Sequence, residues 1–359
     1  MTAYNYARLK DCFRRAARGE ELTLGFFGGS ITQGSLAAVP ENCYAYRVYR
    51  WWCAAFPQAV FHYVNAGIGG TSSHYGAGRV VGDLLMYQPD VVIVDFSVND
   101  LEFPFAQETY EGVLRRILAW PSAPAVVLLN NIYYSDGRTA QDLHNAVGDH
   151  YGVPHVSIRE TIYAAMQAGR YTRQALTPDG LHPNDFGHRL VANEICRLLA
   201  AVNARRDEPE PFPAALPAPL TANTYEHARR LTIRECCPQL AGFRADTTEK
   251  TGHLDHWKNG WIGKRPGDRI TFTVDAADIA VQFRRTIRRP ALRAALVLDG
   301  DRAHPVVLDG NFDEDWGDCL ALTPILHHGK DTTHTVEITI LPCEEEKAME
   351  FYLLSLIVA

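Results

Sequence analysis

The sequence lacks an excess of positive charge and has no long hydrophobic run. Lysine and arginine total 35 against 42 aspartate and glutamate residues, which gives a formal net charge of −7. Proteins that bind nucleic acid usually carry a basic surface for the phosphates, so we expect no nucleic-acid partner. No segment approaches the roughly 18 consecutive apolar residues of a membrane-spanning helix, so we expect no membrane association.

The N-terminus and the cysteines lack the patterns of a secreted protein. Residues 1–10 do not place an apolar segment after a charged one, as a signal peptide does, and instead predict an amphipathic helix. The eight cysteines contain no C-x-x-C pair. We therefore expect reduced thiols in a cytoplasmic protein, with the oligomeric state left open.

A proline-rich segment divides the 359 residues into two parts. Five prolines fall between Pro209 and Pro219, a density that excludes a helix or a central strand. The length alone favours two domains. We predict a catalytic domain at 1–204, a linker at 205–222 and a second domain at 223–359.

The first part alternates apolar runs with helical patterns, which favours a parallel sheet covered on both faces. The predicted strands lie at 22–27, 60–64, within 89–100, at 125–129 and at 153–157. The predicted helices cover 108–120, 139–149 and 185–203. The second part instead shows short alternating strands at 269–274, 279–283, 335–340 and 350–358, with Asp-Gly turns at 298–301 and 308–311. This pattern is typical of an antiparallel β-sandwich.

Ser30 follows the first predicted strand directly, after Gly28 and Gly29. Ligands bind at the carboxyl ends of strands in open parallel sheets, and glycines let the backbone turn sharply there. A solvated glycine-rich turn is the simpler alternative for this segment taken alone.

Asp179 and His182 provide the partners that a nucleophilic serine needs. A serine hydroxyl requires a neutral imidazole to accept its proton, and the imidazole requires an acceptor at its other nitrogen. The two residues are three positions apart, so a single turn can present both on one face. We predict Ser30 as nucleophile, His182 as general base and Asp179 as the residue that orients the imidazole.

Two further strand ends carry donors for an oxyanion. Gly70 lies in a glycine-rich loop after the second strand, and Asn99 lies just past the third. Backbone N–H groups and a side-chain amide are fixed dipoles suited to this task. We predict an oxyanion hole from the N–H groups of Ser30 and Gly70 and the side chain of Asn99, with a polar turn or helix cap as the alternative at Asn99.

Ser30, Gly70, Asn99 and His182, in this order and setting, resemble the four sequence blocks of the SGNH hydrolases, also called the GDSL esterase/lipase superfamily. The resemblance covers about residues 20–200. It implies a three-layer α/β/α, flavodoxin-like fold with a five-stranded parallel sheet, a Ser-His-Asp triad and the oxyanion hole named above. Two positions differ: Gly29 replaces the aspartate of Gly-Asp-Ser, and Ser97 replaces the glycine before Val-Asn-Asp.

The second domain carries tryptophans in loops, at Trp257, Trp261 and Trp316. Such side chains can stack on a sugar ring, although large aromatics more often fill cores. The pair His253 and His256 and the acidic cluster Asp313, Asp315 and Asp318 lack the ligand sets of zinc or calcium sites, so we predict no metal. His74, His144, His155 and His188 remain unassigned.

The architecture resembles two-domain carbohydrate esterases, which implies a jelly-roll-like second domain that could bind carbohydrate. We expect a serine esterase that removes O-acetyl groups from a small or oligomeric saccharide without a cofactor. The alternatives are a lipase, thioesterase or arylesterase, an acyltransferase, and a non-catalytic carbohydrate-binding protein.

Overall fold

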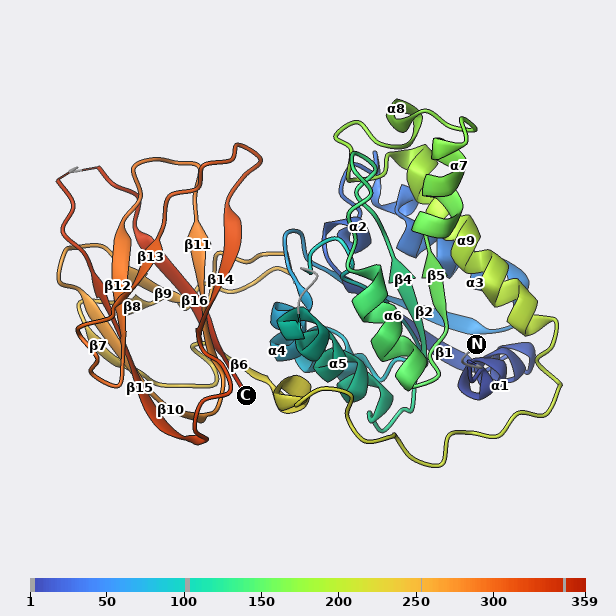
Figure 1. Ribbon diagram of the computed structural model, residues 1–359, viewed down its shortest axis with the longest axis horizontal. Coiled ribbons are helices and arrows are strands. Elements are labelled where there is room, and N and C mark those ends of the chain that lie inside the picture. The colour runs from blue at the N-terminus through green and yellow to red at the C-terminus, as the bar shows by residue number, and fades with distance from the viewer. Residues whose placement is uncertain (1–3, 101–103, 253, 345–346) are drawn as a thin grey trace. The chain divides into compact units, whose positions relative to one another are not determined.

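The computed structural model describes residues 4–100, 104–252, 254–344 and 347–359 (Figure 1). The chain forms two compact units, Met1–Glu226 and His227–Ala359. The first is an α/β unit and the second consists of β-strands. We describe each unit by itself.

The first unit is built on a parallel sheet with the strand order β2-β1-β3-β4-β5. Its strands are β1 (Glu21–Gly28), β2 (Val60–Gly67), β3 (Val91–Asp95), β4 (Ala125–Asn130) and β5 (His155–Ser157). Strands β3 and β4 are apolar except at their last residues and are buried along their whole length, as expected where helices cover both faces. The predicted five-stranded parallel sheet is confirmed.

Helices cover both faces of this sheet (Figure 1). The described helices of this part of the chain are α1 (Ala7–Ala17), α2 (Ser30–Gln33), α3 (Tyr44–Ala55), α4 (Ser73–Asp83), α5 (Pro104–Leu118), α6 (Gln141–His150), α7 (Ala164–Gln167), α8 (Arg173–Leu176) and α9 (Asp185–Asn203). Short 3-10 helices lie at η1 (Pro40–Asn42), η2 (Leu85–Tyr87) and η4 (Thr224–His227), and a π-helix at η3 (Arg159–Tyr163). Helices α1, α3 and α9 share one apolar core with β1, β3 and β4. On the other face α4 packs against Phe27 and Phe96, and α6 against Leu128. The layers are therefore α/β/α.

Several elements differ from their predicted bounds; helix α5, for example, begins at Pro104 rather than at residue 108. Helix α1 begins at Ala7 rather than near the first residue; residues 1–3 lie outside the described part of the chain. Strand β3 ends at Asp95, because the N–H groups of Asn99 and Asp100 both bond to the carbonyl of Phe96 and close a turn. Strand β5 begins at His155, immediately after a proline.

The proline-rich segment runs along the first unit. The buried carboxylate of Glu111 accepts hydrogen bonds from the backbone N–H groups of Leu220 and Thr221, at 2.6 and 2.7 Å. Arg115 donates to the carbonyl of Pro217 at 2.9 Å. Side chains of α5 thus satisfy the polar backbone of a segment that has no regular structure of its own.

The second unit contains two antiparallel sheets, of order β13-β12-β15-β10-β7 and β14-β11-β16-β9-β8, with β6 paired to β16. Its strands are β6 (Arg229–Leu231), β7 (Gln239–Ala241), β8 (Arg244–Ala245), β9 (Trp261–Gly263), β10 (Arg269–Ala276), β11 (Ile279–Arg285), β12 (Arg293–Leu298), β13 (Val306–Asp309), β14 (Cys319–Leu326), β15 (Thr332–Ile340) and β16 (Phe351–Val358). Apolar residues of both sheets form one core. The predicted β-sandwich is confirmed.

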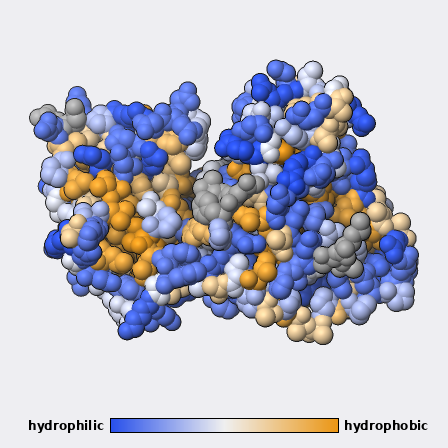
Figure 2. All heavy atoms as spheres, viewed as in Figure 1, coloured by the Kyte–Doolittle hydropathy of each residue, from blue (hydrophilic) through white to orange (hydrophobic). Residues whose placement is uncertain are grey.

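The surface of the second unit is partly apolar. Figure 2 shows a hydrophobic area over its strands on the face turned to the viewer, bordered by hydrophilic atoms. Among the exposed apolar side chains of this unit are Leu240, Val307 and Trp316. No helix among the described residues is long and apolar enough to cross a membrane.

Candidate active site

Ser30 lies at the carboxyl end of β1, as the first residue of the short helix α2. The strand ends at Gly28, and the N–H of Gln33 bonds to the carbonyl of Gly29, which turns the chain at once. Ser30 is 7% exposed. The turn thus places the hydroxyl at the sheet edge where the other strands also end.

The imidazole of His182 lies between the hydroxyl of Ser30 and the carboxylate of Asp179. Its Nε2 is 2.8 Å from Ser30 Oγ, and its Nδ1 is 2.7 Å from Asp179 Oδ2. A carboxylate only accepts, so Nδ1 carries the proton and Nε2 presents its lone pair to the serine hydroxyl. This arrangement can deprotonate the hydroxyl as it attacks a carbonyl carbon.

The carboxylate of Asp179 is fixed by its own loop. Asp179 Oδ1 accepts from the hydroxyl of Thr177 and from the N–H groups of Leu181 and His182, at 3.0, 2.9 and 2.8 Å. Burial raises the pKa of Asp179, but the hydrogen bonds from His182 and from the backbone outweigh it and leave the pKa below its usual value. The side chain is therefore an anion near neutral pH, and its second oxygen is free to orient the imidazole.

The loop that carries His182 is anchored at the start of α9. Asn184 caps this helix by accepting from the N–H of Gly187 at 3.0 Å, and its own N–H bonds to the carbonyl of Leu176 at 2.9 Å. The cap fixes the backbone two residues after His182, so the imidazole is held by a rigid element.

Asn99 and the glycine-rich loop after β2 lie next to Ser30. A Cβ atom built on Gly29 would be 2.1 Å from Asn99 Oδ1, and one built on Gly69 would be 3.7 Å from Ser30 Cβ. Gly69 is tied to α2 by a hydrogen bond from its N–H to Gln33 Oε1 at 2.6 Å. Gly70 follows with a φ of +68°, a backbone conformation that favours glycine. The three predicted oxyanion donors thus belong to segments that meet at the nucleophile.

Ser97 bonds away from the reacting atoms. Its hydroxyl donates to the carbonyl of Asn131 at 3.0 Å, and its carbonyl accepts from the N–H of Ala140 at 2.7 Å. The side chain that replaces glycine here joins the ends of β3 and β4.

Buried polar residues beneath the nucleophile loop were missed in the sequence. Asp95 Oδ2 accepts from Thr32 Oγ1 at 3.0 Å and from Asn131 Nδ2 at 2.9 Å. Burial raises the pKa of Asp95 to about 7, against the lowering effect of these two donors. His188, one turn into α9, donates from Nε2 to the carbonyl of Ser35 at 3.2 Å. The sequence offered one weak signal for each residue: Asp95 ends an apolar strand, and His188 lies on the apolar face of a predicted helix.

The three tryptophans lie in different environments. Trp261 is 1% exposed and packs edge-to-face on Phe272 in the sandwich core, so neither of its faces is open to a sugar ring. Trp257 is half-buried. Trp316 is 55% exposed, and its indole N–H donates to Glu314 at 2.5 Å.

The candidate metal ligands of the second domain have other partners. Asp313 pairs with Arg289 at 2.8 Å, and Asp318 accepts from Thr286 Oγ1 at 2.6 Å. His253, which with His256 formed the histidine pair weighed and rejected as a metal site, lies outside the described residues. Within either unit taken alone, the described residues bring no three histidine, cysteine, aspartate or glutamate ligands close enough to hold a metal ion.

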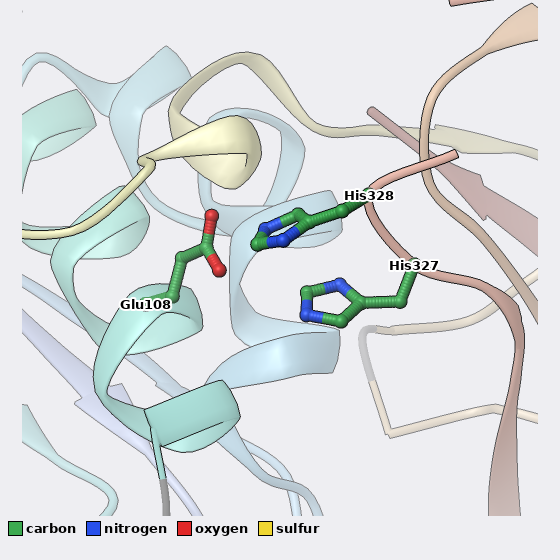
Figure 3. Close-up of side chains that lie close together, drawn as sticks. All are labelled: Glu108, His327 and His328. Carbon is green, nitrogen blue, oxygen red and sulfur yellow. The ribbon is translucent and has the colours of Figure 1, made fainter. Parts of the chain in front are cut away.

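Figure 3 draws Glu108, which projects from α5 of the first unit, and His327 and His328, which follow β14 in the second. Glu108 accepts hydrogen bonds from the N–H and hydroxyl of Thr224, at 3.0 and 3.1 Å. The imidazoles of His327 and His328 stack with ring centroids 3.9 Å apart.

The fold and the grouping of a serine, an imidazole and a carboxylate at its strand ends are those of an ester hydrolase of the three-layer α/β/α class. The model of the GDSL-like Lipase/Acylhydrolase family matches residues 26–190. The chain belongs to this family and is a carboxylic ester hydrolase.

Two solved structures are similar over almost the whole chain. Both are of a two-domain esterase (CEX) active on acetylated mannans. One was co-crystallised with mannopentaose; it is 46% identical, with a TM-score of 0.95 over 99% of this chain and 95% of that one. The other is 45% identical, with a TM-score of 0.97 over 99% and 96% of the two chains. No curated protein matches the chain.

Proposed function

We propose that this protein is a carbohydrate O-acetylesterase in which Ser30 is the nucleophile, His182 the general acid and base, and Asp179 the residue that orients the imidazole. The observation that carries the proposal is the continuous contact from Ser30 Oγ through the His182 ring to Asp179 Oδ2, at 2.8 and 2.7 Å. The activity of CEX on acetylated mannans supports the choice of acetyl groups on a mannan-type saccharide.

Acylation begins when Ser30 Oγ attacks the acetyl carbonyl carbon and its proton passes to His182 Nε2. The carbonyl oxygen becomes an oxyanion, which receives hydrogen bonds from the N–H groups of Ser30 and Gly70 and from the Asn99 amide. The bond from carbon to the sugar oxygen then breaks, and His182 gives its proton to that oxygen. Water deprotonated by His182 attacks the acetyl-enzyme, and acetate leaves as the proton returns to Ser30.

The test is release of acetate from acetylated manno-oligosaccharides. We expect turnover by the wild type and loss of at least about 1,000-fold in kcat for Ser30→Ala, since the nucleophile is removed. Ser122→Ala is the matched control, because this hydroxyl donates to the carbonyl of Pro89 before β3, at the opposite end of the sheet. We expect it to keep full activity.

The acyl group is tested with nitrophenyl esters of increasing chain length. We expect the highest kcat/KM for acetate. A preference for chains of eight or more carbons would contradict the acetylesterase proposal and favour a lipase. Transfer of acetyl to an added alcohol in preference to water would favour an acyltransferase.

A further inference from the structure

The oxyanion hole proposed above is assembled from separate loops. Gly70 lies in the loop between β2 and α4, whereas Asn99 lies in the turn after β3. An oxyanion hole works only when its donors are held at hydrogen-bond distance from the developing charge. Some feature of the fold must therefore hold these two loops in register.

The carboxylate of Asp100 joins the two loops directly. Asp100 follows Asn99 in the chain, and its Oδ1 accepts from the backbone N–H of Ser73 at 2.8 Å. Ser73 lies three residues after Gly70 and begins α4. The bond therefore ties the backbone next to one proposed donor to the backbone near the other.

A buried histidine holds the second oxygen of this carboxylate. His144 Nε2 is 2.9 Å from Asp100 Oδ2, and the two side chains are 0% and 1% exposed. The imidazole stacks on Tyr110 of α5, with ring centroids 3.6 Å apart and planes inclined by 3°. Its Nδ1 has no hydrogen-bond partner among the described residues. Since Asp100 Oδ2 only accepts, the proton of the imidazole lies on Nε2.

The buried Nδ1 of His144, which has no hydrogen-bond partner among the described residues, costs folding free energy. An aliphatic residue on α6 would fill the same space without burying a polar nitrogen that lacks a partner. Within the described part of the chain, the only polar contact of the imidazole is with Asp100, and this contact fixes the rotation of the carboxylate. A carboxylate held at both oxygens presents Oδ1 to Ser73 in one orientation only.

We propose that His144 is a positioning residue for the oxyanion hole, acting through Asp100 to hold the Asn99 turn and the Gly70 loop in register. The inference rests on the proposed function. His144 does not touch the substrate, so its loss should weaken stabilisation of the oxyanion and leave ground-state binding intact.

The test compares His144→Phe with His144→Gln, using nitrophenyl acetate and rates corrected for the folded fraction. Phenylalanine keeps the stacking on Tyr110 but removes the donor, whereas glutamine can place an N–H where Nε2 was. We expect kcat to fall about 10-fold or more in His144→Phe with KM within about twofold, and His144→Gln to recover most of the loss.

Val147→Ala is the matched control. Val147 lies one turn further along α6, is 0% exposed and has no polar side-chain atom. We expect its substitution to lower the melting temperature and leave kcat unchanged. If His144→Phe matched Val147→Ala, losing stability and no kcat, the proposal would be wrong.

Asp100→Asn provides a second measurement should His144→Phe fold poorly. Its amide keeps one oxygen to accept from Ser73 but replaces the anionic oxygen that faces His144 by an NH2 group, so the charge-assisted contact with the imidazole is lost. We expect kcat to fall in Asp100→Asn. We also expect the double variant that combines Asp100→Asn with His144→Phe to be no slower than Asp100→Asn alone, since both residues act through one link. Additive losses would overturn the proposal. Ser30→Ala tests the proposed function separately, because it removes activity whatever the role of His144.

Discussion

Asn99 Oδ1 occupies the space that a side chain on Gly29 would need. A Cβ atom built on Gly29 would lie 2.1 Å from this oxygen and 3.0 Å from Asn99 Cγ. The glycine that replaces aspartate in Gly-Asp-Ser therefore lets the amide lie directly against the nucleophile loop.

Gly29→Ala should consequently displace Asn99. We expect kcat for nitrophenyl acetate to fall about 10- to 100-fold with little change in KM, because a donor moved by an ångström no longer meets the oxyanion. Gly82→Ala is the control: it lies on α4, and its Cβ would meet no atom within 4 Å. Equal activity in the two variants would mean that Asn99 does not serve the reaction.

We predict that the folded protein loses stability in acid because His188 is buried in its neutral form. Burial lowers its pKa to about 4, because the ring is enclosed between α3 and α9. Its Nδ1 accepts from the N–H of Tyr44 at 3.3 Å, which requires the neutral form. In the unfolded chain His188 binds a proton near pH 6.5, whereas in the folded chain it binds one only near pH 4. Stability should therefore fall as the pH decreases from 6.5 to 4, by about 2 kcal/mol between pH 7 and 5.

Urea unfolding of the wild type and His188→Gln at pH 7 and 5 isolates this effect. The variant should be less stable at pH 7, since glutamine has no acceptor at the position of Nδ1, where Tyr44 donates its N–H. Its stability should nevertheless drop by about 2 kcal/mol less than that of the wild type between the two pH values. Parallel changes in both proteins would show that His188 is protonated equally in the folded and unfolded states.

The parallel sheet was predictable because apolar segments that include parts of its strands alternate along the chain with helical patterns. Helix α9 was predicted at its observed bounds, since its apolar positions repeat at helical spacing. In the second unit β10, β11, β15 and β16 were predicted, because alternation and apolar runs identify strands. Strand β14 was not predicted, because it contains Pro324 and a proline in a sequence argues against a strand. The structure places β14 at the edge of its sheet, where a proline is tolerated.

Residues of the candidate site were predictable only where a motif named them. Ser30, Asp179 and His182 lie in short, recognisable segments. His144 has no such signal, because its contact with Asp100 joins residues 44 positions apart and depends on how α6 packs. The same holds for Asp95 and Thr32, which are 63 positions apart and meet only because β1 and β3 are neighbours. Side chains that support a site are fixed by tertiary packing rather than by local pattern.

We predict that Asp95 contributes more to the stability of the folded protein at pH 5 than at pH 8. The contribution of His188 changes with pH in the opposite direction. The pKa of Asp95 is raised to about 7 by burial, so the folded chain keeps a proton that the unfolded chain releases near pH 4. This contribution is complete below pH 4 and is lost as the pH rises towards 7. In Asp95→Asn the position stays neutral at every pH.

Relative to Asp95→Asn, the wild type should lose about 3 kcal/mol of stability between pH 5 and 8. Urea unfolding of both proteins at the two pH values measures the difference. An unchanged difference between pH 5 and 8 would mean that Asp95 ionises at the same pH in the folded and unfolded chains.

Trp316 is the tryptophan of the second unit best placed to stack on a saccharide, because its side chain is 55% exposed and held by Glu314. We expect Trp316→Ala to raise the KM for acetylated mannan several-fold and to leave kcat/KM for nitrophenyl acetate unchanged, since the small ester has no sugar ring to stack. Trp316→Phe keeps an aromatic face and should retain most of the affinity. Val307→Ala, at a similarly exposed apolar side chain of the same unit, should change neither value. Equal KM values for the polymer in Trp316→Ala and Val307→Ala would remove Trp316 from the binding surface and leave saccharide selection to other residues.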